Sequence, residues 1–110
     1  MEIITIKENR DFRRLYRKKT SLVSPALVVY FNENGAGFSR LGITAGKKVG
    51  KAVKRNRAKR VIRQAFFTLL PKFKKNVDMV IVARAKCAEL KSFEVTQQLE
   101  NLLKKAKIID

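Results

Sequence analysis

Residues 51–70 read KAVKRNRAKRVIRQAFFTLL and end immediately before Pro71. At about 100° per residue, six apolar side chains fall on one side of a helix built from this stretch: Ala58, Val61, Ile62, Ala65, Phe66 and Leu69. Proline stops such a helix because its ring clashes with the preceding turn and it lacks an N–H group. The stretch therefore predicts an amphipathic helix from about Lys51 to Leu70 that packs on the core of the domain.

The opposite side of this predicted helix is basic. Within an arc of about 140° lie one amide and four cationic side chains: Arg55, Asn56, Lys59, Arg60 and Arg63. No acid lies within four residues of any of them, and like charges at that spacing cost roughly 0.2–0.5 kcal/mol per pair. A bound polyanion is the natural compensation, with a repulsive but solvated face as the alternative.

The segments on either side of the helix predict strands. Residues 26–32 (ALVVYFN) and 38–45 (FSRLGITA) are extended runs separated by NENGAG, whose Asn and Gly residues favour a hairpin turn. After them, AGKKVG places two lysines between glycines, where the backbone can approach a phosphate closely. Beyond the helix, residues 77–84 (VDMVIVAR) form the apolar run of a buried strand.

Further helices are expected at both ends of the chain. Asn9 can cap a helix to about Lys18, and Ser92 can cap another to about Lys107. The apolar stripe of the first includes Phe12, Leu15 and Tyr16, and that of the second consists of Val95, Leu99, Leu102, Leu103 and Ala106. The order α-β-β-β-α-β-α predicts one α+β domain over residues 1–110, a sandwich of a mixed sheet and helices.

The charge of the chain is large and segregated. Its 110 residues carry a formal net charge of +17, and 45% of them are hydrophobic, enough for a folded core. No Asp or Glu occurs between Asn34 and Val77, whereas 13 of the 26 Lys and Arg residues do. Such a one-signed field points to nucleic acid as the partner, ahead of acidic lipid or a small molecule.

The composition also bears on location and catalysis. A single cysteine, no membrane-length apolar run and no signal-like start predict a soluble cytoplasmic protein. There is no histidine, no metal-ligand spacing and no carboxylate in the basic segment, and GKKVGK lacks the order of a phosphate-binding P-loop. We therefore expect no autonomous active site in this chain and no metal held by it.

Residues 47–66, KKVGKAVKRNRAKRVIRQAF, resemble the signature of the bacterial ribonuclease P protein subunit family. NRDFRRLY, LVVYF and VDMVIVAR are similar to the family's first helix, first strand and the strand after the basic helix. Together these matches span nearly the whole chain. The positions that fit the signature in register are Lys47, Lys48, Gly50, Ala52, Val53, Arg55, Asn56, Arg57, Lys59, Arg60 and Arg63.

The resemblance implies a fold and a function. The fold has a left-handed βαβ crossover around the basic helix, and the function is that of a protein subunit of an endoribonuclease. Its partners are a catalytic RNA, which holds Mg²⁺, and precursor tRNA, whose 5′ leader is cleaved off. The implied RNA-binding residues are Lys47, Lys48, Lys51, Arg55, Asn56, Arg57, Lys59, Arg60 and Arg63, and the implied cleft for the single-stranded leader contains Phe12, Tyr16, Val28 and Tyr30.

Other functions remain open on the residues alone. Phe12 and Tyr16 suit a core as well as a platform for unstacked bases. A ribosomal or other structural RNA-binding protein shares the size, the charge and the lack of catalytic groups. A protein-only nuclease and a membrane-active cationic peptide fit less well, because the carboxylates are scattered and the chain contains buried strands.

Overall fold

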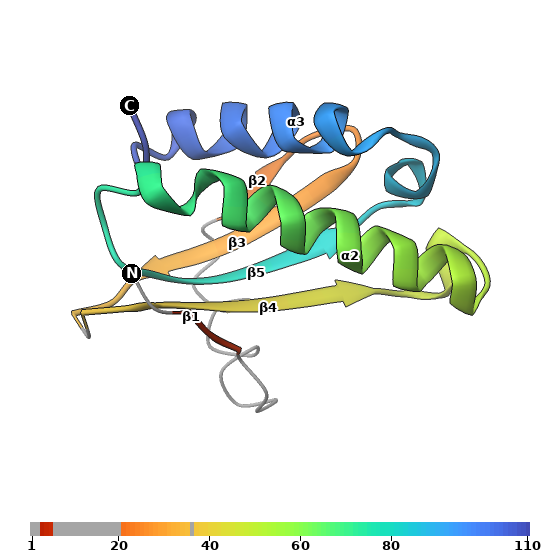
Figure 1. The fold of residues 1–110 in the computed structure, drawn as a ribbon, viewed down its shortest axis with the longest axis horizontal. Helices are drawn as coiled ribbons and strands as arrows, with labels where there is room; N and C mark the ends of the chain where they lie inside the picture. The colour runs from red at the N-terminus through yellow and green to blue at the C-terminus, as the bar shows by residue number, and fades with distance from the viewer. Residues whose placement is uncertain (1–2, 6–20, 36) are drawn as a thin grey trace.

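The computed structural model describes residues 3–5, 21–35 and 37–110 (Figure 1). In chain order the elements are β1 Ile3–Thr5, β2 Ser21–Val23, β3 Leu27–Glu33, β4 Ser39–Ala45, α2 Ala52–Leu69, β5 Val77–Ala83 and α3 Ser92–Lys105. Short 3-10 turns cover Lys47–Val49, Leu70–Lys72 and Ala85–Glu89. The helix predicted over residues 9–18, with Phe12 and Tyr16, lies outside the described residues.

The strands form one mixed sheet in the order β1-β4-β5-β3-β2. β1, β4 and β5 are parallel, β3 is antiparallel to β5, and β2 is antiparallel to β3. β5 is central and pairs along its length with both β3 and β4. Six of its seven residues are buried, which explains the continuous apolar run in the sequence.

The expected hairpin between residues 26–32 and 38–45 was wrong. Those two strands run in opposite directions, as the turn residues indicate, but β5 lies between them. The N–H of Asn34 donates to the carbonyl of Asn76, 3.0 Å away, so the turn pairs with the entry to β5. The turn residues after β3 determine that the chain reverses its direction. Burial of the apolar residues of β5 determines that this strand occupies the centre of the sheet. β2 supplies the third strand that the predicted order places before the basic helix, although its residues were not specified, and β1 was not predicted.

The connection from β4 to β5 through α2 is a left-handed crossover. The two strands are parallel neighbours, and α2 runs back across one face of the sheet between them (Figure 1). Parallel strands are joined with the opposite hand in nearly all proteins. The resemblance to the ribonuclease P protein subunit implied this exception, which the residue pattern does not reveal.

The buried face of α2 agrees with the prediction residue for residue. Its buried side chains are those predicted from the helical angle: Ala58, Val61, Ile62, Ala65, Phe66 and Leu69. The helix is one residue shorter at each end than expected, and Pro71 lies in the 3-10 turn that follows it. The ring of Phe66 meets that of Phe73 edge-on, with centroids 5.3 Å apart. The apolar half of α2 is thus part of the core.

α3 packs beside α2 on the same face of the sheet and runs in the same direction (Figure 1). Four of its five predicted core residues are buried, and Ala106, just beyond the helix, is partly buried. Ser92 is the first residue of the helix rather than its cap; the Glu94 carboxylate accepts a hydrogen bond from the N–H of Lys91 at 3.4 Å. Both helices therefore cover one face and leave the other face of the sheet for different contacts.

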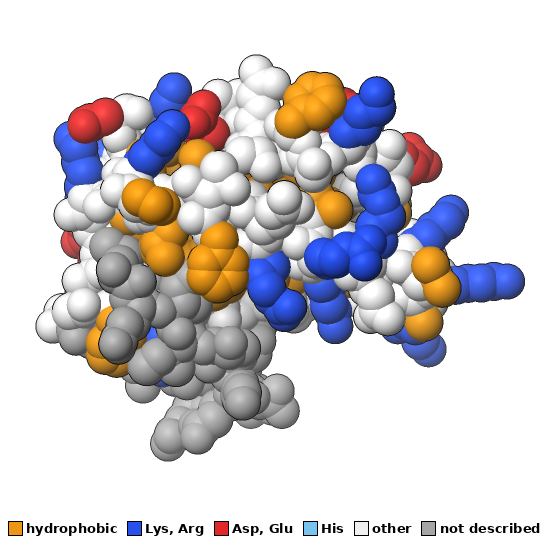
Figure 2. Space-filling view, viewed as in Figure 1, with side chains coloured by type: hydrophobic (Ala, Val, Ile, Leu, Met, Phe, Trp, Pro, Cys, Tyr) orange, Lys and Arg blue, Asp and Glu red, His pale blue; other side chains and the backbone are white. Residues whose placement is uncertain are grey.

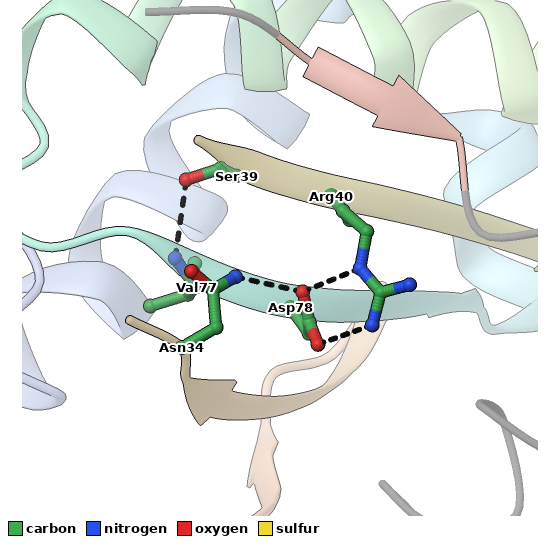
Figure 3. A network of polar contacts seen from close by, with 5 residues as sticks. All are labelled: Asn34, Ser39, Arg40, Val77 and Asp78. Atoms are coloured by element: carbon green, nitrogen blue, oxygen red, sulfur yellow. Dashed lines mark hydrogen bonds and ion pairs between the residues drawn. The ribbon is translucent and has the colours of Figure 1, made fainter. Parts of the chain in front are cut away.

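A polar network lies at one end of that second face (Figure 3). The carboxylate of Asp78 on β5 accepts two hydrogen bonds from the guanidinium of Arg40 on β4, at 2.8 and 2.6 Å. It also accepts one from the side-chain amide of Asn34, at 2.8 Å. Because Asp78 is 8% exposed, these three donors replace the water that a carboxylate needs. The network joins β4, β5 and the turn after β3.

We expect Asp78→Ala to lower the free energy of unfolding by about 2 kcal/mol, because it removes the buried carboxylate that binds the Arg40 guanidinium and the Asn34 amide. Lys75→Ala is the matched control. It removes an exposed ion pair with Glu33 at 2.8 Å, which should contribute less than about 1 kcal/mol. Urea unfolding of the two variants measures the difference. Equal losses in both would show that the buried network adds nothing to stability.

Candidate nucleic-acid interface

The two predicted lysines before α2 lie on an exposed turn. Lys47 and Lys48 are in the 3-10 turn Lys47–Val49, and the N–H of Gly50 donates to the carbonyl of Lys47 at 3.1 Å. Gly50 has φ = 135°, and a Cβ there would lie 2.7 Å from the Lys54 side chain. Only glycine therefore fits this junction between the turn and the helix. The junction places Lys47, Lys48 and Lys51 beside the start of α2.

The basic ridge consists of Arg55, Asn56, Lys59, Arg60 and Arg63 on α2. Asn56, Arg60 and Arg63 are exposed, while Arg55 and Lys59 are half-buried. The Nε of Arg55 is buried and has no hydrogen-bond partner within the described part of the chain. Figure 2 shows Lys and Arg side chains gathered over the end of the molecule where α2 begins. Ridge and turn together form one basic surface.

Arg57 differs from the other predicted RNA-binding residues. Its guanidinium donates to the carbonyl of Ala88 at 2.9 Å and to that of Leu90 at 3.1 Å. These bonds attach α2 to the segment between β5 and α3. Burial raises the pKa of the nearby Cys87 thiol, and the charge of Arg57 partly offsets this. Arg57 therefore has a structural role in this chain, whatever else it contacts.

The second face of the sheet carries two further predicted site residues, Val28 and Tyr30. Val28 pairs with Val82, and Tyr30 pairs with Val80, so the four side chains lie on one face. Val80 is fully buried, and Tyr30 and Val82 pack against it as partly buried neighbours. Val28 and Tyr30 thus share one apolar surface across two strands, as the alternation of β3 predicted. Phe12 and Tyr16 cannot be placed relative to it, since they lie outside the described residues.

A hollow of about 540 Å³ connects the two surfaces. It is lined by Lys48 from the basic turn and by Val82 from the sheet face. Arg84 and Lys86 also line it, and sequence reasoning did not select them. Their position directly after the predicted buried strand could have indicated these two residues, because the end of β5 lies beside the turn that precedes α2. The basic and apolar surfaces therefore adjoin at this end of the sheet.

The described residues offer no metal centre and no membrane span. Among residues 3–5, 21–35 and 37–110, no group of three or more His, Cys, Asp or Glu side chains could hold a metal ion. No helix within these ranges is long and apolar enough to cross a membrane. What the described surface does provide is a set of hydrogen-bond donors and positive charge.

Fold and surfaces together define a small basic α+β domain with cations on one helix and a second, partly apolar sheet face that carries Val28 and Tyr30. The family model described as Ribonuclease P matches residues 3–107, and this chain belongs to that family. The Ribonuclease P protein component of Alkaliphilus oremlandii is 37% identical over 105 residues, covering 96% of this chain and 92% of that protein. Its counterpart in Clostridium botulinum (strain Langeland) is 39% identical, with 94% of each chain covered.

Solved structures agree with this family. The RNase P protein of Staphylococcus aureus superposes with a TM-score of 0.85 and 34% identity, covering 99% of this chain and 100% of that chain. The RNase P protein of Thermotoga maritima gives a TM-score of 0.81 at 35% identity, covering 92% and 96%. Membership of this family makes the chain a protein of tRNA processing and a component of an endoribonuclease.

Arg57→Ala should mainly lower stability, whereas Arg60→Ala should mainly weaken RNA binding. The first loses two hydrogen bonds to carbonyls and should lower the free energy of unfolding by about 1–2 kcal/mol. The second should change stability by less than about 0.5 kcal/mol, yet weaken RNA binding and reduce its salt slope by about one. Urea unfolding and filter binding to a bacterial ribonuclease P RNA over a KCl series measure both. An unchanged slope for Arg60→Ala would show that Arg60 touches no phosphate.

Proposed function

We propose that this chain is the protein component of a ribonuclease P ribonucleoprotein, which removes the 5′ leader of precursor tRNA while the RNA subunit performs the cleavage. The proposal rests on one observation, which is that two surfaces adjoin at one end of the sheet. A basic surface for phosphates adjoins a partly apolar face for unpaired bases, through the hollow shared by Lys48 and Val82. A precursor tRNA presents both structured phosphates and a single-stranded leader.

The basic surface acts electrostatically. Lys47, Lys48 and Lys51, with the ridge, supply point charges and guanidinium forks for phosphate oxygens. Asn56 can donate and accept hydrogen bonds towards a base or a 2′-hydroxyl. Two RNAs brought together repel each other, and cations placed between them lower that repulsion. The result is tighter assembly of the catalytic RNA with its substrate at physiological salt.

The sheet face that carries Val28 and Tyr30 adds preference for the substrate over the product. Val28 and Tyr30 offer an apolar and aromatic surface on which leader bases can stack. Mature tRNA lacks the leader, so this contact is made before cleavage and lost after it. Differential binding of this kind strengthens substrate capture without retaining the product.

Magnesium belongs to the RNA in this proposal. The basic surface has no carboxylate among its residues, and its cations would repel a divalent ion. Mg²⁺ bound by RNA phosphates can stabilise the developing charge of phosphodiester cleavage. The cations of the protein screen neighbouring phosphates, so that the RNAs come together at a lower Mg²⁺ concentration.

The test is stimulation of cleavage at low Mg²⁺. Purified protein is added to a bacterial ribonuclease P RNA with labelled precursor tRNA, and leader release is measured. We expect faster cleavage with the wild-type chain, less stimulation with Arg60→Ala, and full stimulation with Lys105→Ala, which loses the same charge from the end of α3. RNA binding without stimulation would instead indicate a structural RNA-binding protein.

Tyr30→Ala tests the sheet face separately. We expect it to weaken binding of leader-bearing tRNA to the holoenzyme by roughly five- to tenfold, because base stacking on an aromatic ring contributes on the order of 1 kcal/mol or more. Binding of mature tRNA should not change. Tyr30→Phe, which keeps the ring, should bind like the wild type. Equal losses for leader-bearing and mature tRNA in Tyr30→Ala would rule out a leader contact at this residue.

A further inference from the structure

Phe67 is an exposed aromatic residue that neither the core nor the proposed function uses. It is 52% exposed, although the adjacent Phe66 is fully buried. Asn56, Arg60, Arg63 and Phe67 follow one another at spacings of four, three and four residues, which places them in one line along α2. Phe67 thus continues the basic ridge on the outer side of the helix layer.

A second exposed aromatic residue lies across a groove from this line. Phe93, at the start of α3, is 65% exposed. It lines a hollow of about 390 Å³ between the two helices, together with Gln64 and Thr68 of α2. Apolar side chains are exposed on the same face as part of the basic group (Figure 2). Phe93 borders this groove, and Phe67 directly precedes Thr68 of its lining, so two exposed aromatic residues lie at or next to the groove.

The charges beside the groove favour an anionic occupant. Neither Arg60 nor Arg63 forms an ion pair or a hydrogen bond with any residue that the structure describes. Among the described residues that line the groove, the one carboxylate is that of Glu100, and it is already paired with Lys72 at 3.3 Å and with Lys104 at 3.8 Å. The free charge at this place is therefore positive. A second copy of the chain, also at +17, would be repelled.

We propose that Phe67 is a stacking platform for an unpaired RNA base, with the flanking phosphates held by Arg60 and Arg63. Gln64, one turn before Thr68, can read the edge of a base that enters the groove towards Phe93. The helix layer covers the face of the sheet opposite to Tyr30 and Val28. The strand bound here is therefore a different one from the leader, and on the proposed function it belongs to an unpaired segment of the RNA subunit.

The chain has no tryptophan, so Phe67→Trp introduces a single reporter at the platform. Stacking of a base on the indole should quench its fluorescence when a short single-stranded oligoadenylate is added. Asn101→Trp, at an exposed position of α3 rather than in line with the basic ridge of α2, is the matched control and should stay unquenched. A ribose-phosphate oligomer of the same length without bases should not quench the Phe67→Trp variant.

Each outcome decides the proposal. Quenching of the Phe67→Trp variant by oligoadenylate alone supports it, whereas no quenching at saturation, or equal quenching by the baseless oligomer, overturns it. Quenching that rises with protein concentration in the absence of RNA would assign the groove to a second copy instead. Phe67→Ala should lower the affinity for an unpaired segment of ribonuclease P RNA at least about fivefold, and Phe67→Tyr should restore it.

The cleavage assay separates this proposal from the proposed function. If the Phe67→Trp variant stimulates cleavage fully but oligoadenylate does not quench its fluorescence, the stacking proposal is wrong and the proposed function still stands. If oligoadenylate quenches the fluorescence of this variant but the variant does not stimulate cleavage, the stacking proposal is supported and the proposed ribonuclease P function is contradicted. Urea unfolding of Phe67→Ala should show a midpoint close to that of the wild type, because Phe67 is about half exposed and is not one of the buried core residues.

Discussion

Burial of one side of α2 against the sheet is the constraint on which the rest of the molecule depends. Ala58, Ile62 and Phe66 are fully buried, so the rotation of the helix about its axis is determined by packing. A helix whose rotation is set in this way must present its remaining side chains in fixed directions. The cations of the basic ridge therefore point outward because the apolar residues between them point inward. Their arrangement is a consequence of core packing and needs no ligand to form it.

β5 lies at the centre of the sheet, and its side chains on the two faces contact different parts of the molecule. Its odd-numbered residues, such as Met79 and Ile81, face the helices and are fully buried. Its even-numbered residues face the other way, where Val80 supports Tyr30 and Asp78 binds Arg40. A strand buried on both faces can thus hold the helix layer in place and also support the partly apolar face that carries Tyr30. The same strand ends at the hollow that Lys48 shares with Arg84, so it links both surfaces of the interface.

Local periodicity predicted the elements well and their assembly less well. The buried residues of α2 and the three long strands follow from spacing, because helical and extended repeats are properties of neighbouring residues. Strand adjacency is not local, so the expected hairpin was wrong and the hand of the crossover came only from the family resemblance. The role of Arg57 was beyond the pattern, because it binds the carbonyls of Ala88 and Leu90, about thirty residues away in the chain. The exposure of Phe67 does follow from the helical spacing, although the sequence analysis did not select this residue.

The strand order has a consequence for how the chain acquires its structure during synthesis. β3 and β4 leave the ribosome well before β5, yet neither has the other as a neighbour. Until Val77–Ala83 emerges, both strands have an unsatisfied edge, and the apolar side of α2 has no completed sheet to cover. Assembly of the core is therefore a late and cooperative event that waits for about three quarters of the chain. A nascent chain with a strong positive charge would spend this interval beside ribosomal RNA, whose phosphates attract the same cations that the folded protein presents.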